Sequence, residues 1–488
     1  MRAFTYTALP ARVVFGVGAL DKLAAEIDRL GAKRALVLST REQRAAAEDI
    51  ARLLGARTAG IYDKAVMHTP IESAEDARRV AAQLQADCCV AIGGGSTTGL
   101  GKAIALTSSL PIVAIPTTFA GSEMTPIQGI TADGVKKTVR DARLLPKTVI
   151  YDPRLLLTLP AHIAGPSGMN AIAHCVEALY AEEENPVTSL MAEEGIRALA
   201  ASLPSVVREP RNIEARGEAL YGAWLAGISL GTVGMSLHHK LCHTLGGSFN
   251  LPHAEVHTVV LPQALAFNAA AAPQAMQRIE EALGITGRTS AAAGLFDLAR
   301  DNGALVALKD IGMREADLDR AAEIAVSNPY WNPRPFGAAQ RGQSARREFE
   351  LQLGVSLAAR RQSVEIVHGL RHDLAARRGR ARYLRDLVVD PEQHRGRERV
   401  RVGEVLLGVT ALPDRGDEPG EDRRERDQCR GDGVPVAADE LPRTIRPRVA
   451  PCVDRQAREV APQVLRELLR AAVAPRGIVA ERGRDDRV

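Results

Sequence analysis

Aromatic residues are scarce in this chain. Only 3% of its 488 residues are Phe, Trp or Tyr, against 45% hydrophobic residues overall. A hydrophobic core must therefore be built from aliphatic side chains and alanine. Cysteines are also few, and the six of them form no CxxC pair and have no regular spacing, which argues against a disulfide framework or a zinc ribbon.

Long hydrophobic runs are absent as well. No stretch reaches the ~18 apolar residues that a membrane-spanning helix requires. The first residues, MRAFTYTALPARVVFG, lack a basic flank followed by an apolar core, so they do not resemble a secretory signal peptide. We therefore expect a cytoplasmic protein with no membrane partner. At ~100–200 residues per domain, the length predicts two to four domains.

Lysine is missing from the last third of the chain. The nine lysines end at Lys309, whereas residues 338–488 carry 31 arginines and 25 acidic residues. Arginine without lysine, among many Gly, Ala, Asp and Val residues, is typical of GC-rich DNA translated in a wrong frame. We predict that residues 337–488 are an Arg-rich tail, either disordered or produced by a frameshift near residues 335–337. A nucleic-acid-binding arm is the remaining alternative for this region.

The first two-thirds of the chain are balanced in charge, with 32 basic and 34 acidic residues in 1–337, so no nucleic-acid partner is expected there. Residues 1–155 alternate short β-rich runs with helical stretches, which predicts an α/β domain with a parallel, doubly wound sheet. The expected strands are 34–38, 88–92, 112–115 and 148–151, and the expected helices are 19–30, 41–54 and 73–85. Residues 156–336 change to long alanine- and leucine-rich segments, which predicts an all-α catalytic domain.

A glycine-rich segment, AIGGGSTTGLGK at residues 91–102, follows one predicted strand and begins a helix. Glycines let the backbone approach a pyrophosphate, and the N–H groups at a helix start stabilise its charge. The segment is not GxGxxG, so alone it could be an ordinary strand–helix turn. A second polar loop, PTTFAGSEM at residues 116–124, follows the next predicted strand. Two such loops at the carboxyl ends of parallel strands predict a nucleotide site.

Histidines are concentrated in SLHHKLCHTLGGSFNLPH at residues 236–253. His239 and His253 lie fourteen residues apart, with a Gly-Gly pair between them. Upstream, Asn170 and His174 of NAIAH are four residues apart, so both side chains leave one face of a helix. Three histidines and one short polar side chain could converge on a metal ion, but the fourth group is an amide rather than a carboxylate.

With these motifs in order, residues 1–335 resemble the iron-containing alcohol dehydrogenase superfamily, and within it the maleylacetate reductase subgroup. The resemblance rests on AIGGGSTTGLGKAIAL, PTTFAGSEMTPIQGIT, SGMNAIAHCVEALY, LHHKLCHTLGGSFNLPHAEVH and SNPYWNPRP. It implies the dehydroquinate synthase-like fold, an N-terminal dinucleotide-binding domain, a homodimer, and NADH or NADPH as cofactor. It also implies reduction of the carbon–carbon double bond of 2-maleylacetate to 3-oxoadipate in the breakdown of aromatic and chloroaromatic compounds.

The chain departs from the metal-dependent members of the superfamily at one ligand. Those members have Asp, His, His and His at the positions of Asn170, His174, His239 and His253. A neutral amide is a weak ligand and removes one negative charge from a site meant for a dication. We therefore expect no metal, a vestigial site, and histidines that bind the substrate carboxylates. Two competing hypotheses remain: a metal-dependent alcohol dehydrogenase acting on a small alcohol or aldehyde, and an inactive chain with an interaction tail.

Roles for individual residues follow from the same resemblance. His243, four residues after His239, is expected to lie on the same helix face and to donate the proton to the developing enolate. Lys240 and His238 should add positive potential, unless their side chains point to solvent. Whether Tyr330 or Trp331 touches the substrate is left open.

On the cofactor side, the resemblance implies that Gly94, Gly95 and Ser96 hold the pyrophosphate, that Thr117 and Thr118 lie by the nicotinamide ribose, and that Lys136 contacts the cofactor. The superfamily often has Asp at the position of Thr40, where it binds the adenosine ribose. Without that carboxylate a 2′-phosphate is not repelled, so we expect NADPH to be tolerated beside NADH.

Overall fold

The computed structural model describes residues 3–9, 11–67, 69–132, 135–285, 287, 289–336 and 457–473. Within these ranges only the backbone is described for 130–132, 135–137 and 457–464. Most of the predicted tail, residues 337–456 and 474–488, lies outside the described residues, so the predictions of disorder and of a frameshift there remain predictions.

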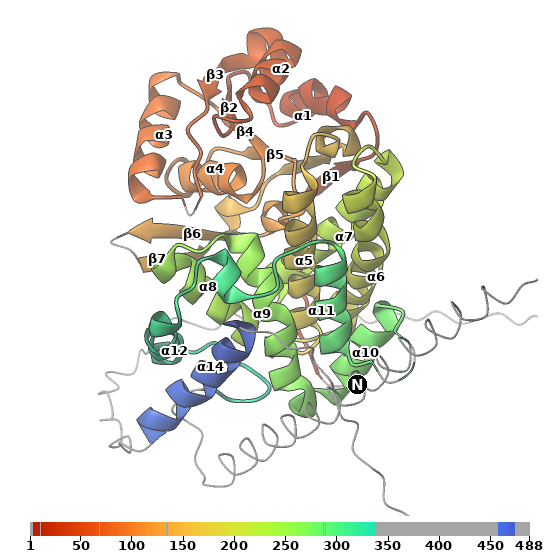
Figure 1. Cartoon of the computed structure of the whole chain (residues 1–488). Coiled ribbons are helices and arrows are strands. Elements are labelled where there is room, and N and C mark those ends of the chain that lie inside the picture. Colours follow the sequence, from red (N-terminus) through yellow and green to blue (C-terminus); the bar gives the residue numbers. More distant parts are fainter. Residues whose placement is uncertain are drawn as a thin grey trace, which may run out of the picture. The chain divides into compact units, whose positions relative to one another are not determined.

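A six-stranded, all-parallel sheet forms the first part of the fold (Figure 1). Its strands, in spatial order, are β1 (Arg12–Phe15), β8 (Thr148–Tyr151), β5 (Ile112–Pro116), β4 (Cys88–Gly93), β2 (Ala35–Leu38) and β3 (Thr58–Tyr62). The chain runs outward from β2 to β3 and then returns to β4 on the other side of β2, so the strand order reverses between β2 and β4. Ligands of open α/β sheets bind at such a reversal, outside the carboxyl ends of the strands.

Helices cover both faces of this sheet. Alternate residues of β2 face opposite ways: Ala35 and Val37 pack toward α1 (Leu23–Arg29) and α2 (Arg44–Leu54), whereas Leu36 and Leu38 pack toward α3 (Ile71–Gln83) and α4 (Gly95–Ser108). Strands buried on both faces are expected to be almost uniformly apolar, as these are. The predicted α/β fold class is confirmed. The sequence analysis missed the edge strands β1 and β3.

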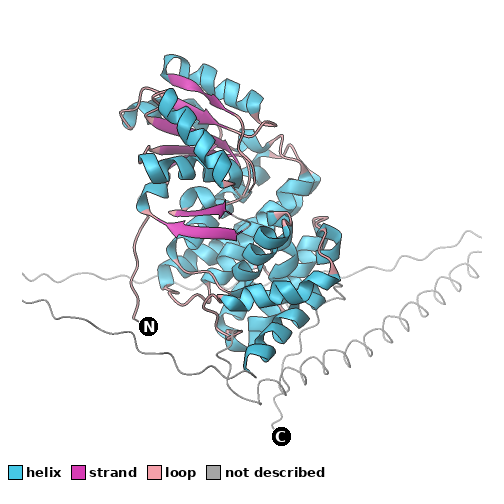
Figure 2. Ribbon diagram, turned by 90° about the vertical axis from the view of Figure 1, so that its left-hand side faces the viewer, coloured by secondary structure: helices cyan, strands magenta, loops and turns pink. Residues whose placement is uncertain are grey.

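A two-stranded antiparallel ribbon stands apart from the main sheet (Figure 2). It consists of β6 (Ile127–Ala132) and β7 (Val135–Arg140), and the sequence analysis did not predict it. Lys136 lies in β7, paired with Thr131. Its side chain is not among those described, so its contact with the cofactor stays a prediction.

The second part of the fold is helical, as predicted. One core cluster is formed by α5 (Ala161–Ala178), α6 (Pro186–Arg208), α7 (Ile213–Thr232), α10 (Pro273–Ala282) and α11 (Ala291–Asp301). A second cluster is formed by α8 (Leu237–Phe249), α9 (His253–Asn268) and α12 (Leu318–Ser327). Short 3₁₀ turns occur in both parts of the fold, at Ala19–Lys22, Gly55–Arg57, Ser122–Met124, Ala142–Leu144, Pro153–Leu156, Ala269–Ala271, Leu308–Ile311 and Glu315–Asp317.

Small residues take the place of aromatic ones in the helical core. The helices α6 and α7 approach closely at Gly195 and Gly222, where a Cβ atom on Gly222 would lie 3.1 Å from the Gly195 carbonyl oxygen. An alanine at Gly222 would also come 2.7 Å from a Leu199 side-chain carbon. Such close packing without large side chains is what the low aromatic content predicts.

One further helix, α14 (Ala457–Val473), packs on this helical part. It lies beside α12 and also contacts α9 (Figure 1). Its apolar positions recur three and four residues apart, at Leu465, Leu468, Leu469 and Ala472, and all four side chains are buried. The sequence analysis missed this amphipathic period because the surrounding residues are arginine-rich and irregular.

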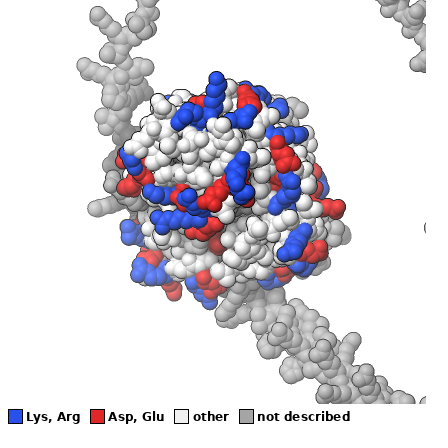
Figure 3. Space-filling view, turned by 90° about the horizontal axis from the view of Figure 1, so that it is seen from above, with Lys and Arg blue, Asp and Glu red and all other residues white. Residues whose placement is uncertain are grey.

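No single helix among the described residues is long and apolar enough to cross a membrane, although the bent pair α7 and α8 passes the same criterion of length and composition together. On the surface, basic and acidic side chains are interspersed over the face seen in Figure 3. Ion pairs of this kind in the α/β part join Arg57 to Asp28 and Arg44 to Asp63.

Candidate active site

The glycine-rich segment forms the turn from β4 into α4. Gly93 has φ +148°, a region that L side chains rarely adopt, and a Cβ atom on Gly94 would lie 3.0 Å from both Cγ2 and Oγ1 of Thr118. No described side chain caps the first turn of the 14-residue helix α4. Its N–H groups are therefore available to a pyrophosphate, and the missing Cβ atoms let Thr118 pack against this turn.

Hydroxyl groups also lie at the carboxyl ends of these strands, near the start of α4. Within the described part of the chain, Ser39 Oγ, Thr97 Oγ1 and Ser122 Oγ are buried and have no hydrogen-bond partner. Gln43 Nε2 donates to Thr117 Oγ1 at 2.7 Å, which joins the loop after β2 to the loop after β5. Unsatisfied hydroxyls beside an uncapped helix fit the phosphates and riboses of a dinucleotide. The sequence analysis missed Gln43, which carries no motif.

Thr40 lies at the position expected for the ribose of a dinucleotide, after β2. A negatively charged group lies close to it, because the Thr40 hydroxyl donates a hydrogen bond to the Glu42 carboxylate. The pKa of Glu42 is lowered by its own backbone N–H and then by this hydroxyl. A carboxylate therefore lies close to the Thr40 hydroxyl, and the expected tolerance of NADPH stays a prediction.

Lys102 links α4 to the loop that follows β5. Its Nζ donates to Ser122 O at 2.6 Å, Thr125 Oγ1 at 2.9 Å and Ile127 O at 2.8 Å. Burial lowers the pKa of Lys102 to about 7, although the nearby Glu123 opposes the shift. The sequence analysis quoted this lysine within its motif but assigned it no role.

The loop held by Lys102 reaches the histidines. Gly121 has φ +76°, and a Cβ atom on it would lie 3.4 Å from His174 Nδ1 and 3.1 Å from Gly227 Cα. No larger residue could occupy this position without moving α7. The loop after β5 therefore lies directly beside the histidine cluster.

Three helices bring the histidine cluster together. The α5 helix presents Asn170, His174 and Glu177 at four- and three-residue spacing, while α8 contributes His239 and α9 begins at His253. The ring centroids of His174 and His239 lie 5.1 Å apart. His253 lies 4.4 Å from the ring of His257, the next residue on its own helix face. His174, His239 and His253 therefore belong to one cluster of imidazoles, and Asn170 lies one turn before His174 on α5.

Glu177 organises the start of α8. Its carboxylate accepts hydrogen bonds from the backbone N–H groups of Ser236 and His238, each at 2.8 Å, and from His239 Nδ1 at 2.8 Å. An acidic group at a helix N-terminus is favourable electrostatically, and here it also fixes the orientation of an imidazole. The sequence analysis missed Glu177, although its position three residues after His174 placed it on the same helix face.

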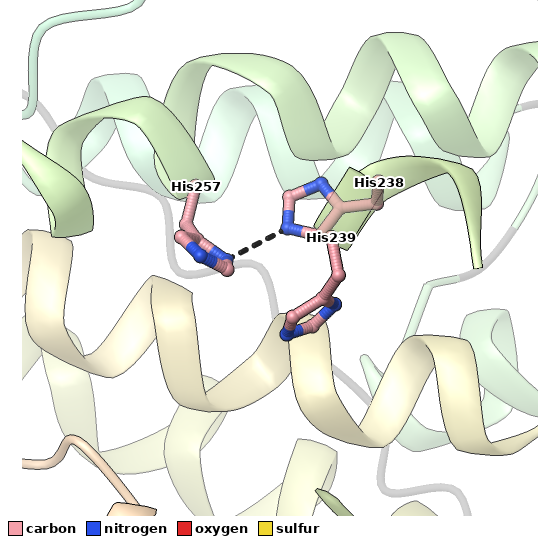
Figure 4. A group of neighbouring side chains, drawn as sticks. All are labelled: His238, His239 and His257. Atoms are coloured by element: carbon pink, nitrogen blue, oxygen red, sulfur yellow. Dashed lines mark hydrogen bonds between the residues drawn. The ribbon is translucent and has the colours of Figure 1, made fainter. Parts of the chain in front are cut away.

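A second pair of imidazoles lies behind this set. His238 Nε2 and His257 Nδ1 are hydrogen-bonded at 2.9 Å, and both side chains are fully buried (Figure 4). Burial, followed by the neighbouring imidazoles, lowers the pKa of each well below 6.5. His238 is therefore neutral near pH 7, and the expectation that it adds positive potential or points to solvent was wrong.

Several polar atoms of the cluster have no hydrogen-bond partner among the described residues: Asn170 Oδ1, His174 Nδ1, His239 Nε2 and His257 Nε2. Burial, together with the His239 and His253 rings, also lowers the pKa of His174 well below 6.5. A buried group without a partner costs ~1–3 kcal/mol, so these atoms mark a place where a ligand binds.

A metal ion is one ligand to consider. His238, His239 and His257 offer atoms within 4.8 Å of one another and could hold an ion. This group differs from the predicted set, since it shares only His239 with it. Two of its nitrogens already bond each other, and Asn170 supplies no charge, so the fit to a resident dication is poor. Imidazole-rich sets suit zinc better than magnesium or calcium.

His243 lies one turn along α8 from His239, with ring centroids 6.0 Å apart. Its Nδ1 is 3.0 Å from Tyr330 Oη, and Lys240 Nζ lies 5.5 Å above the same tyrosine ring. Burial raises the pKa of Tyr330 and lowers that of Lys240. Tyr330 therefore belongs to this site through His243, whereas Trp331 is largely exposed. The role of Tyr330 could not be assigned from the sequence, since the contact spans 87 residues.

The comparison with known proteins agrees with this architecture. Residues 10–153 match the iron-containing alcohol dehydrogenase family, and residues 165–341 match the C-terminal part of the Fe-containing alcohol dehydrogenase family. The chain is 61% identical over 336 residues to maleylacetate reductase of Burkholderia cepacia, a match that covers 69% of this chain and 95% of that protein.

Solved structures extend the comparison. A putative alcohol dehydrogenase from Ralstonia eutropha JMP134 is 65% identical with a TM-score of 0.68, and maleylacetate reductase from Agrobacterium tumefaciens is 52% identical with a TM-score of 0.66. Both matches cover 69% of this chain, and they cover 94% and 95% of the respective solved chains. The chain therefore belongs to the iron-containing alcohol dehydrogenase family.

Proposed function

We propose that this protein is a maleylacetate reductase, which reduces the carbon–carbon double bond of 2-maleylacetate to 3-oxoadipate with NADH or NADPH. The observation that carries the proposal is the buried cluster with unsatisfied polar atoms that includes Asn170, combined with the His243–Tyr330 pair. An amide at the superfamily's carboxylate position disfavours metal-bound alkoxide chemistry. A positioned proton donor suits reduction of an activated double bond.

The dinucleotide, when bound, supplies a hydride. Gly94, Gly95 and Ser96 at the start of α4 are the residues that would hold its pyrophosphate, and Thr117 and Thr118 are those assigned to the nicotinamide side. The loop that contains Thr117 and Thr118 is held by Lys102, and at Gly121 it reaches His174. We assign this loop the task of setting the distance between the cofactor and the substrate.

Proton delivery is assigned to His243. Hydride addition to the alkene carbon farther from the ketone leaves an enolate, and the other alkene carbon then takes a proton. When the Tyr330 hydroxyl donates to Nδ1 of His243, the ring proton lies on Nε2, and we assign Nε2 the role of proton donor to the alkene carbon. Lys240, above the tyrosine ring, adds positive charge near the developing enolate.

The substrate is a dianion, so two carboxylates must be bound. His174, His239 and His253 are the proposed partners, since Nδ1 of His174 and Nε2 of His239 have no described partner in the chain. Glu177 accepts the Nδ1 proton of His239 and so fixes the orientation of this ring. We further propose that no metal takes part, and that the enzyme is a homodimer, as the resemblance implies.

A metal-dependent alcohol dehydrogenase is the second candidate. The group of His238, His239 and His257 is the observation in its favour. The two functions differ in product: one consumes NADH with maleylacetate and yields 3-oxoadipate, and the other oxidises small alcohols with NAD.

The test is to incubate the purified full-length protein with NADH and maleylacetate, and to identify the product by mass spectrometry. Stoichiometric 3-oxoadipate, with no comparable turnover of ethanol or propanediol, supports the proposal. Alcohol oxidation without maleylacetate reduction would replace it with the second candidate.

A further inference from the structure

The helix α14 covers the back of the helices that carry the candidate catalytic residues. Leu465, Leu469 and Ala472 are fully buried, in the same apolar cluster as residues of α8, α9 and α12. On its opposite side, Arg470 and Ala471 are exposed. A helix that buries one continuous stripe and exposes the other is a packed part of its domain.

The same cluster includes residues from the segments that carry His243, His257 and Tyr330. From α8 it contains Leu241 and Leu245, which flank His243 in the sequence, and from α9 it contains Val256 and Val260, which flank His257. It also contains Phe336, which ends the segment that presents Tyr330. A shift of this cluster therefore moves the imidazoles and the tyrosine relative to one another.

An ion pair also links α14 to α12. Arg466 Nε lies 2.5 Å from Asp319 Oδ1 on α12, an ion-pair distance without hydrogen-bond geometry. This pair lies beside the apolar stripe and opposes sliding of α14 along α12. Because more than 100 residues separate the two helices in the chain, their pairing must be specified by contacts such as these.

We infer that α14 is a working part of the catalytic domain: it docks onto α9 and α12 of its own chain and braces the helices that hold His243 and His257. The tail is then not dispensable as a whole, because this segment supports turnover through its packing on α9 and α12. The kinetic part of the inference rests on the proposed reductase function, whereas its structural part does not.

The experiment compares two adjacent substitutions in the full-length chain. Ala472→Asp places a charge in the apolar cluster, while Ala471→Asp places the same charge on the exposed side. We expect Ala472→Asp to lower the midpoint of thermal unfolding by at least about 5 °C and turnover at least tenfold. Ala471→Asp should change turnover less than twofold. Equal behaviour of both variants would overturn the inference.

Hydrogen exchange separates local bracing from general unfolding. In Ala472→Asp the amides of α8 and α9 should exchange faster, while those of β4 and β5 keep their protection. Equal acceleration in the sheet would overturn the local role of α14. If the wild-type chain does not reduce maleylacetate, the proposed function fails, and unfolding and exchange still decide whether α14 docks.

A charge swap tests docking without burying a charge. Asp319→Arg and Arg466→Asp should each lower the unfolding midpoint, and the double variant should recover most of the loss. Failure of the double variant to recover would contradict the paired position of α14 on α12.

Discussion

At the scale of single residues, the site depends on which ring nitrogen each histidine presents. Glu177 occupies Nδ1 of His239, Tyr330 occupies Nδ1 of His243, and His238 occupies Nδ1 of His257. These partners orient the imidazoles before any substrate binds, which reduces the reorganisation that turnover requires.

Replacement of His243 by alanine should therefore affect chemistry rather than cofactor binding. We expect kcat with maleylacetate to fall about 10²–10⁴-fold, the usual contribution of a general acid, with the KM for NADH within about threefold of wild type. Steady-state kinetics measure both, and the exposed His162→Ala serves as a matched control. A wild-type turnover in His243→Ala would remove this residue from the mechanism.

Asn170 is predicted to keep the cluster free of metal. Asn170→Asp restores a carboxylate beside the unsatisfied nitrogens of His174 and His239, so the variant should bind zinc at least tenfold more tightly than wild type. The added negative charge should also repel the dianionic substrate and raise its KM. Metal analysis after dialysis, together with kinetics, checks both; unchanged zinc binding would mean that the residue does not face the cluster.

The individual positions were partly predictable from the sequence. Four-residue spacing placed Asn170 with His174, and His239 with His243, because helix geometry alone decides those pairs. The hydrogen bond of His238 to His257 could not be predicted, since it depends on how α8 packs against α9. Burial lowers the pKa of His238 and so removes the positive charge that was expected of it.

At the scale of secondary-structure elements, Lys102 links α4 to the loop that reaches the histidines. The folded-state pKa of about 7 lies below the ordinary value of 10.5, so between these values the unfolded chain binds a proton that the folded chain does not. Stability contributed by this group therefore rises with pH over that window.

Lys102→Met should remove this increase of folding stability with pH. We expect the wild type to gain roughly 1–2 kcal/mol relative to Lys102→Met between pH 7 and pH 9, because the three oxygens that accept from Nζ reduce the full effect of the shift. Urea unfolding at both pH values measures the difference, with the exposed Lys22→Met as control. Parallel pH curves for wild type and Lys102→Met would show that the lysine stays charged in the fold.

Element prediction succeeded where a signal was strong and local. The buried strands β2, β4, β5 and β8 are short apolar runs between helical stretches, and each was found. The strand β3 was missed because TAGIY is only half-buried at the sheet edge. The helix α14 was missed because its period is short and lies within an arginine-rich region.

At the scale of the whole molecule, the fold brings the proposed dinucleotide site, at the carboxyl ends of the strands, close to a histidine cluster between three helices. The loop from Thr117 to Ile127 joins them. The central claim is that this assembly reduces maleylacetate without a metal, because an amide replaces the superfamily's carboxylate at Asn170.

The most direct measurement is the loss of NADH absorbance with maleylacetate, using full-length protein stripped of metal by chelation and checked by elemental analysis. We predict the same kcat as for untreated protein, with no increase on addition of zinc or iron. Activity that disappears on chelation and returns with either metal would contradict the account and assign the three-histidine group to a catalytic ion.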